Sequence, residues 1–344
     1  MRDPNGVDLD TFPSAMGIIT RLACDRAKQE GAEVDALLRK AGLTHQQIDD
    51  PRIRLAVKAQ IQFLELAART LRDDYLGFHL AKKFDPRMTG LFHYVLASSD
   101  TLDEALQRAA RYSAIVNEGI TLKFHEGKSV GLSFEYAGVG RHTDCHQIEF
   151  AMVTLVRTCR QLTNRHLPAS RVSFTHQRKK DITEFRTFFG SDVRFGAAVD
   201  ELAFSSSIRG MPIVGADRYL NELLIEYCEE AISTRASKPI SFGLNVENAI
   251  ALLLPHGEAR VATVARKLGV SRRTLARRLA SEKLTFARVA QQLKSDLAKR
   301  HLADASLSIS EIAWLLGYQD VSAFTHAFKR WTGKTPRAVR QRSS

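Results

Sequence analysis

In the last hundred positions of the chain, apolar residues recur at helical spacing, and a glycine interrupts the pattern. From Ala262 to Leu279 they recur every three or four residues on both sides of Gly269. This pattern predicts a helix, a tight turn and a second helix. Ser271 stands where a side-chain oxygen can cap the second helix, and Leu275 shares an inward face with Leu279. The positions left on the outward face are Arg272, Arg273, Ala276 and Arg277.

A second copy of the pattern follows about 48 residues later. Gly317 corresponds to Gly269, and Asp320 is placed to cap the next helix. Phe324 and Phe328 replace the two inward leucines. The predicted outward positions of this helix are Val321, Ser322, Thr325, His326 and Lys329.

Residues 286–302, between the two copies, have the periodicity of one continuous helix. A helix of 17 residues spans roughly 25 Å at about 1.5 Å per residue. Such a spacer is suited to hold two recognition helices about 34 Å apart, which is the distance between successive major grooves on one face of a duplex.

The positive charge of the chain is concentrated in the same region. The whole chain has 50 Lys and Arg against 38 Asp and Glu, a net charge of +12. From Ser241 onward, 18 Lys and Arg stand against 7 Asp and Glu, so this segment holds +11 of that charge. A basic segment is typical of a disordered tail, a membrane-surface helix or a nucleic-acid binder, and the regular apolar spacing disfavours a tail. The charge therefore favours a folded domain that binds nucleic acid, and the paired helix-turn-helix pattern indicates double-stranded DNA.

The second copy and the residues after it form one long pattern of fixed glycine, aromatic and proline positions. The run is Ile312-Ala313-x-x-x-Gly317-Tyr318-x-Asp320-x-Ser322-x-Phe324-x-x-x-Phe328-Lys329-Arg330-x-x-Gly333-Lys334-Thr335-Pro336-x-x-x-Arg340. Over about a hundred residues the chain resembles the DNA-binding domain of AraC/XylS regulators. The resemblance implies base-facing positions at Arg273, Ala276, Arg277, Val321, Ser322, Ala323 and His326. The predicted DNA-binding set is completed by Ser271, Arg272, Thr325, Lys329 and Arg330.

Two positions depart from that family. His326 stands where the family often has arginine, and Lys283 stands where glycine is common after the first recognition helix. Neutral imidazole lacks the bidentate fork with which arginine reads guanine, so the second motif is not expected to contact a guanine in that way.

The first 240 residues predict a mixed architecture. Helices are expected at 15–30, 57–70 and 102–115, the last with a capping box between Thr101 and Glu104. Alternating apolar positions predict a hairpin of strands at 120–124 and 130–136. The remaining expected elements are helices at 145–162, 181–189 and 216–232, a strand at 172–176, and short strands near Val193 and Leu202. The fold class expected is an α+β sensor or dimerisation domain followed by an all-α domain with two helix-turn-helix motifs.

Two further motifs lie in this half, Leu102-x-Glu104-Ala105-Leu106 and Phe188-Phe189-Gly190-x-x-Val193-Arg194-Phe195-Gly196. Here the chain resembles the arabinose-binding-type N-terminal domain of ornithine-utilisation and VirS-like regulators, and not the cupin barrel of AraC. The resemblance implies an effector-binding or dimerisation domain at 1–232. A polar linker is expected at 233–243, and an AraC-type double helix-turn-helix domain at 244–344.

The helix expected at 216–232 has an apolar stripe, formed by Leu220, Leu223, Leu224, Tyr227 and Ala231. Pairing with its twin in a homodimer and packing against its own domain both account for such a stripe.

Other candidate chemistry is sparse. Four widely spaced cysteines at 24, 145, 159 and 228 fit reduced, buried thiols. His142, Cys145 and His146 lie close in sequence but match no usual zinc spacing, so no metal and no cofactor are predicted. The histidines at 79, 93, 125, 142, 146 and 176 are expected to be hydrogen-bonded or at the surface. Two locations are possible for Phe92, Tyr94, Arg111 and Tyr112: they line a small-molecule pocket, or they pack in the protein core.

The function expected is that of a cytoplasmic, effector-responsive transcription activator. It is expected to be a homodimer that binds promoter DNA and a small molecule, contacts RNA polymerase and does not contact a membrane. The N-terminus lacks a secretory core, and no stretch approaches the roughly 18 apolar residues of a membrane span.

Two alternatives compete with this hypothesis. One is a ligand-independent regulator whose N-terminal half only dimerises. The other is an enzyme joined to this motif pair, as in DNA-repair methyltransferases, which would need an activated cysteine. None of the four cysteines stands in a recognisable nucleophile setting, so no enzymatic activity is predicted.

Overall fold

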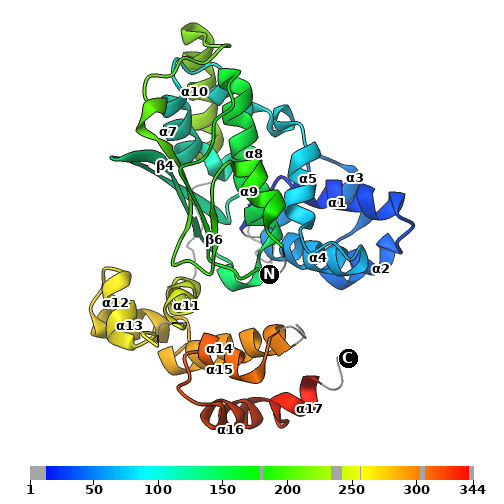
Figure 1. Cartoon of the computed structure of the whole chain (residues 1–344), viewed down its shortest axis with the longest axis vertical. Helices are drawn as coiled ribbons and strands as arrows, with labels where there is room; N and C mark the ends of the chain where they lie inside the picture. The colour runs from blue at the N-terminus through cyan, green and yellow to red at the C-terminus, as the bar shows by residue number, and fades with distance from the viewer. Residues whose placement is uncertain (1–12, 179–180, 234–241, 256, 303–306, 341–344) are drawn as a thin grey trace. The chain divides into compact units, whose positions relative to one another are not determined.

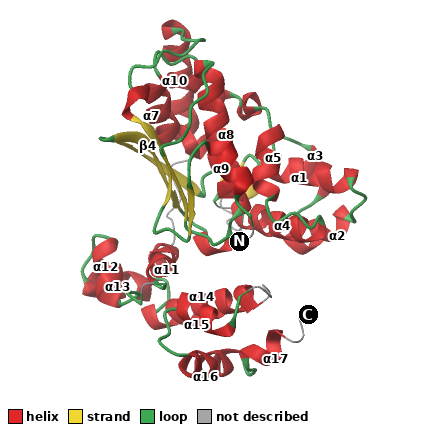
Figure 2. Cartoon of the chain, in the orientation of Figure 1, coloured by secondary structure: helices red, strands yellow, loops and turns green. Residues whose placement is uncertain are grey.

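The computed structural model describes residues 13–178, 181–233, 242–255, 257–302 and 307–340. The chain divides into two compact units, one of residues 1–139 and 143–239, and one of residues 140–142 and 240–344. Figure 2 shows strands together with helices in the first unit, whereas the named elements of the second are all helices. The expected fold class is confirmed. Within the described ranges, no helix has the length and apolar content needed to cross a membrane.

A five-stranded sheet forms the centre of the first unit, with strand order β3-β4-β7-β5-β6. Neighbouring strands are antiparallel except for the parallel pair β5 and β6. The predicted hairpin is confirmed, because β3 pairs with β4 from Ile120 opposite Tyr136 to Glu126 opposite Val130. The strands are β3 Ile120–Glu126, β4 Ser129–Tyr136, β5 Arg171–Phe174, β6 Val193–Phe195 and β7 Asp200–Ser205.

One hydrophobic core joins this sheet to five helices that follow residue 90, and it also includes Val57, Ile61, Phe78 and Ala81 from earlier helices. The helix α8 is at its centre, and Figure 1 shows α8 between the sheet and a separate layer of helices, α1 to α5. Apolar residues of α8 on the sheet side, such as Ile148 and Met152, are fully buried. The five helices are α6 Leu91–Ala97, α7 Leu102–Tyr112, α8 His146–Thr163, α9 Thr183–Phe189 and α10 Arg218–Ser233.

The layer α1 to α5 has a hydrophobic core of its own, which includes Phe63, Leu64 and Leu76. Two short strands, β1 Ser14–Ala15 and β2 Leu55–Ala56, form a ribbon beside it. The helices of the layer are α1 Ile18–Gln29, α2 Val34–Ala41, α3 His45–Asp49, α4 Val57–Thr70 and α5 Leu76–Lys83.

Two of the sequence predictions for helix ends are wrong. The first helix begins at Ile18 rather than at residue 15, because Ser14 and Ala15 pair with β2. The capping box of α7 is not formed, since the Thr101 side chain makes no capping hydrogen bond. Instead, the Thr101 backbone bridges to Pro212, and Glu104 binds Arg108 at 2.9 Å. After Tyr112 the chain continues as a 3-10 turn, Ser113–Ile115.

Helix α10 packs against its own domain with one face only. Cys228 is buried, and the buried Asn221 amide donates hydrogen bonds to the Val95 carbonyl oxygen and to Ser98 Oγ, both at 2.9 Å. On the other face several large apolar side chains are exposed, namely Tyr219, Leu220, Leu223 and Tyr227.

The second unit contains seven named helices in the residues that the structure describes. The predicted spacer helix is confirmed, because α14 spans Phe286–Leu302 without interruption. Of the expected linker, residues 234–241 lie outside the described residues, while Ser233 ends α10 and Phe242 begins α11. The helices are α11 Phe242–Leu253, α12 Val261–Lys267, α13 Arg272–Ser281, α14 Phe286–Leu302, α15 Ile309–Leu315, α16 Val321–Thr332 and α17 Pro336–Arg340.

In the first unit, α5 and α8 approach so closely that one position admits only glycine. A Cβ atom on Gly77 of α5 would lie 1.9 Å from the His146 carbonyl oxygen at the start of α8. Backbone cannot move aside as a flexible side chain can. The two helices must therefore separate if any larger residue replaces Gly77.

The substitution Gly77→Ala should lower the free energy of unfolding of the full chain by about 1–3 kcal/mol, as overpacking of a core does. Thermal unfolding followed by circular dichroism measures the change. The matched control is Gly127→Ala in the β3–β4 turn, where an added Cβ meets nothing within 4 Å. Equal unfolding temperatures for the two variants would contradict the close approach of α5 and α8.

Candidate nucleic-acid interface

The first helix-turn-helix consists of α12, a turn at Gly269 and α13. Gly269 has φ of +65°, a left-handed conformation that glycine adopts without strain. Ser271 Oγ accepts a hydrogen bond from the Thr274 backbone N–H at 3.1 Å, so the predicted cap of α13 is confirmed. Leu275 and Leu279 are buried as predicted and hold α13 against the core of this half.

The second helix-turn-helix repeats this arrangement with α15 and α16. Gly317 has φ of +72°, and a Cβ atom on it would lie 2.7 Å from the Leu254 carbonyl oxygen. Asp320 Oδ1 accepts from the Ala323 backbone N–H at 2.7 Å, so the second predicted cap is also confirmed. Phe324 and Phe328 are fully buried and fix the inward face of α16.

Helix α15 begins with a capping box that the sequence analysis did not identify. The Ser308 hydroxyl accepts from the Glu311 backbone N–H at 3.1 Å, and the Ser308 backbone N–H donates to the Glu311 carboxylate at 2.7 Å. The spacing Ser-x-x-Glu before an apolar run is the signal that could have found it. The box fixes where the supporting helix of the second motif begins.

The residues expected to contact DNA lie on one outward face of each recognition helix. On α13 and at its cap, the exposed ones are Ser271, Arg272, Arg273, Ala276 and Arg277. On α16 they are Val321, Ser322, Ala323, His326, Lys329 and Arg330, while Thr325 is half-buried. Neither helix contains an acidic residue. Each face is thus accessible and free of carboxylates that would repel phosphate.

Two basic side chains of this half are used within the fold. The Arg278 guanidinium lies over the Phe242 ring, 5.3 Å from its centroid, and joins α13 to α11. The Lys294 ammonium of α14 lies 4.3 Å from the centroid of the Tyr318 ring, next to the second motif. Burial lowers the pKa of Lys294. Residue type and spacing could not separate these two cations from those that face outward.

The departure at Lys283 has a structural meaning. Lys283 follows the C-cap of α13 and has φ of +57°. Its backbone N–H donates to the Ala280 carbonyl oxygen at 3.0 Å, and that of Leu284 donates to the Leu279 carbonyl oxygen at 2.9 Å. This is the left-handed helix end at which glycine is preferred, so lysine is tolerated there with some strain.

Comparison with known proteins agrees with this geometry. Residues 264–342, which contain both motifs, match a helix-turn-helix domain family. Residues 31–213, more than half of the chain, match the arabinose-binding domain of AraC transcription regulators. The chain belongs to the AraC family of transcription regulators. Both resemblances noted in the sequence are therefore confirmed.

Relatives of this AraC-family regulator match it over nearly its whole length. The HTH-type transcriptional regulator VirS of Mycobacterium tuberculosis is 28% identical over 323 residues, which cover 92% of this chain and 93% of VirS. The ornithine utilization regulator of Pseudomonas aeruginosa is 26% identical over 320 residues, with the same coverages. The crystal structure of CdpR from Pseudomonas aeruginosa is 23% identical with a TM-score of 0.43, and covers 89% of this chain and 96% of CdpR.

The enzymatic alternative is not supported. The relatives that span this AraC-family regulator are named as transcription regulators. An activated nucleophile needs a lowered thiol pKa. Burial instead raises the pKa of Cys24 and Cys159 to about 12, and that of Cys228 to about 11. The family is one of DNA-binding regulators, and this chain has their activity rather than that of a methyltransferase.

A cavity in the first unit lies apart from the residues first considered for a small-molecule pocket. Of those four residues only Phe92 lines it. Tyr94 is exposed, while Arg111 and Tyr112 bind the Glu229 carboxylate of α10 at 2.5 Å and 2.8 Å. Of the two alternatives left open by the sequence, the pocket therefore applies among these four residues to Phe92, since Tyr94 is exposed and α10 supplies a partner for Arg111 and Tyr112.

The expectation for the histidines is also partly wrong. His93 and His146 are both buried, and Nδ1 of each has no hydrogen-bond partner among the described residues. Burial lowers the pKa of both, so the neutral imidazole is favoured. The sequence pattern cannot reveal this, because a missing partner is a property of the three-dimensional neighbourhood.

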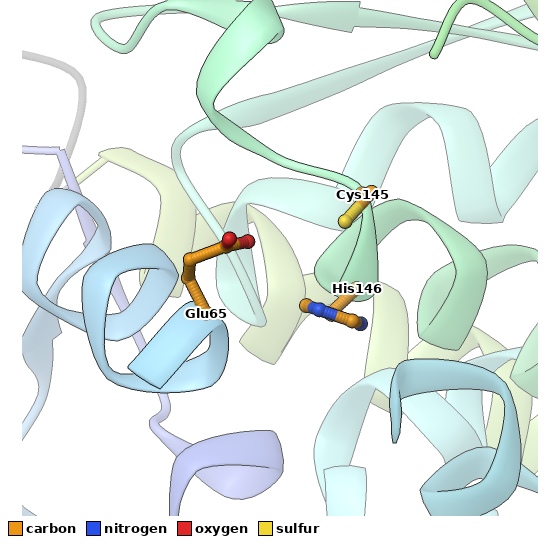
Figure 3. A group of neighbouring side chains, drawn as sticks. All are labelled: Glu65, Cys145 and His146. Atoms are coloured by element: carbon orange, nitrogen blue, oxygen red, sulfur yellow. The ribbon is translucent and has the colours of Figure 1, made fainter. Parts of the chain in front are cut away.

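One group of possible metal ligands occurs in the described part of the chain. Figure 3 shows Glu65 of α4 facing Cys145 and His146 at the start of α8, with ligand atoms within 4.8 Å of one another. Arg69 donates to the Glu65 carboxylate at 2.8 Å, and its positive charge opposes a cation there. Three protein ligands are also one fewer than a closed structural zinc site uses. The absence of a metal remains a prediction.

Proposed function

We propose that this AraC-family regulator reads promoter DNA with both recognition helices at once. Three features support the proposal: the matched caps of α13 and α16, their exposed outward faces without carboxylates, and the single helix α14 between the motifs. Positively charged outward faces suit the phosphates that flank each major groove. The observation that carries the proposal is that α14 packs into the core of both motifs.

Individual contacts follow from side-chain chemistry. Arg273 and Arg277 are the proposed base-reading residues of the first motif, since a guanidinium can bind guanine through two parallel hydrogen bonds. Lys329 and Arg330 lie in the last turn of α16 and are suited to phosphate. His326 is the matching outward residue of the second motif and offers a weaker contact.

We further propose that the N-terminal domain binds a small-molecule effector and that the protein acts in the cytoplasm as an activator that contacts RNA polymerase. The effector proposal is supported by the family of the domain and by a cavity inside it. The exposed face of α10 favours a second possibility, a domain that only dimerises. Effector binding and dimerisation are compatible with each other, because the cavity and α10 use different residues.

A homodimer through α10 is the proposed assembly. Antiparallel pairing of two copies around Leu223 would set Tyr219 of one protomer against Tyr227 of its partner. It would also bring Arg218 near the start of one helix close to Glu226 and Glu230 near the end of the other. The same residues of both protomers would then face one another, as an isologous interface requires.

The first prediction tests the two-groove mode. On duplex DNA that the full chain selects from a random-sequence library, one protomer should protect about 20 base pairs from hydroxyl radicals, given about 10 per turn. Affinity should fall steeply as salt rises, because phosphate contacts release counterions. Salt-insensitive binding would contradict the charged interface, and protection of a single half-turn would show that one motif alone docks.

The second prediction separates the motifs. Arg277→Ala should weaken binding of the selected DNA by about 1–3 kcal/mol and should reduce the preference over scrambled DNA. His326→Ala should cost less. Fluorescence anisotropy at fixed salt measures both. Arg266→Ala on the supporting helix α12 removes the same charge from an exposed position, and should weaken selected and scrambled DNA alike. Equal losses from Arg277→Ala and His326→Ala would refute the asymmetry.

The third prediction concerns assembly. Leu223→Arg places a charge at the centre of the proposed α10 interface, and should convert the full chain from dimer to monomer in sedimentation equilibrium. Val199→Arg is the control, because Val199 is an exposed apolar residue between β6 and β7, away from α10. A Leu223→Arg protein that remains a dimer would exclude this interface.

A further inference from the structure

The cavity in the first unit lies between the two hydrophobic cores of the N-terminal domain. It has a volume of about 130 Å³. Its walls come from residues around the start of α1, from α4, from α6, from β3 and β4, and from α8. Ile19 on one side belongs to the core of the α1–α5 layer, whereas Leu96 and Phe134 belong to the core around the sheet. A molecule held here would therefore contact both cores.

The wall chemistry excludes a charged ligand. The lining is mostly aliphatic and aromatic, and among its described residues none carries a fixed charge. A carboxylate, phosphate or ammonium group would lose its hydration without gaining an ionic partner, which is strongly unfavourable. A sugar fits poorly as well, because its hydroxyl groups would meet a wall surface that is mostly apolar.

Three residues of the wall each have a buried polar side-chain atom without a hydrogen-bond partner among the described residues. The first residue is Gln147, which is 3% exposed. Thr20 Oγ1 bonds to Gln60 Oε1 at 3.1 Å, and Gln60 Nε2 donates to Gln147 Oε1 at 2.5 Å. These two hydrogen bonds use the side-chain oxygen of Gln147. The amide Nε2 of the same side chain has no acceptor among the described residues.

The other two unpartnered atoms are Thr154 Oγ1 and His93 Nδ1. Thr154 lies two turns beyond Gln147 on α8, and His93 is 5% exposed on α6. The neighbouring hydroxyl of Thr158 also lines the cavity, but it donates to the Thr154 carbonyl oxygen at 2.9 Å. Burial of a polar group without a hydrogen-bond partner is unfavourable. Three such atoms in residues around one apolar cavity indicate a binding site whose missing hydrogen-bond partners a ligand supplies.

We propose that this cavity binds an uncharged, ring-sized organic molecule that carries a hydroxyl or carbonyl group. Its apolar ring fills the space between the two cores, and its polar group pairs with the Gln147 amide and the Thr154 hydroxyl. The size is appropriate, since an engineered apolar cavity of about 150 Å³ in another protein binds benzene. The inference rests on the proposed role of the domain as an effector sensor and names the chemical class of that effector.

The test uses the full chain and ligands of nearly one shape. Toluene offers only the ring, p-cresol adds a hydroxyl group, and p-toluate replaces that group with a carboxylate. Isothermal titration calorimetry and thermal unfolding should show binding of p-cresol and toluene, with p-cresol about fivefold tighter, as one hydrogen bond of about 1 kcal/mol implies. p-Toluate, L-arabinose and L-ornithine should neither bind nor raise the unfolding temperature.

Two variants of α8 form a matched pair. Thr154→Val should weaken p-cresol about fivefold and leave toluene unchanged, because it removes the unpartnered hydroxyl without changing the shape. Thr158→Val makes the same substitution one turn away, where the hydroxyl already has a partner, and should leave both affinities unchanged. Ala151→Phe should fill the cavity and abolish binding of both compounds.

The proposal would be overturned if p-cresol did not bind. It would also be overturned if p-toluate, L-arabinose or L-ornithine bound and Ala151→Phe abolished that binding. Equal effects of Thr154→Val and Thr158→Val on the affinity for p-cresol would overturn it as well. Footprinting of the unliganded full chain on its selected DNA is measured in parallel. Normal protection without p-cresol binding refutes only the ligand class. Loss of DNA protection as well refutes the proposed function itself.

Discussion

The DNA-binding half depends on one helix that belongs to two hydrophobic cores. Val289 and Leu293 of α14 pack with the first motif, whereas Ala298 and Leu302 pack with the second. The backbone between these pairs is continuous helix with a rise of about 1.5 Å per residue, so it cannot stretch or shorten without breaking hydrogen bonds. The spacing between the two recognition helices is therefore set by the length of α14. Lys294 over the Tyr318 ring adds a further contact on the side of the second motif.

The N-terminal domain depends in a similar way on α8, but here the polar residues are informative. Glu149 is fully buried, and its carboxylate is bound by Arg178 Nε at 2.8 Å and His176 Nε2 at 2.9 Å. The fold thus supplies partners for a buried charge on this helix, which is the condition for tolerating one. On the same helix, Gln147 Nε2 and Thr154 Oγ1 have no hydrogen-bond partner among the described residues. Glu149 is held by Arg178 and His176, whereas Gln147 and Thr154 are uncharged residues of the cavity wall.

The proposed DNA contacts lie on the surface of one half, whereas the proposed ligand contacts lie inside the other. This difference determined how well each site could be predicted from the sequence. DNA is large and is met at the surface, so its contacts lie on exposed helix faces, and helical periodicity alone separates those faces from the core. A small molecule is met inside, where its contacts come from short stretches far apart in the chain. Gln60, His93, Gln147 and Thr154 have no common spacing or motif, and the aromatic residues considered for a pocket proved mostly to serve other contacts.

The sequence by itself determined the features that depend on residues a few positions apart. These include both helix-turn-helix motifs, the caps at Ser271 and Asp320, the hairpin of β3 and β4, and the full extent of α14. Periodicity and capping act within one or two turns, so the local order of residues is sufficient. Only the tertiary structure decided that Ser14–Ala15 is a strand and that Tyr112 binds Glu229. It also decided that three residues of one cavity wall have polar atoms without partners, because such neighbourhoods arise only when distant segments pack together.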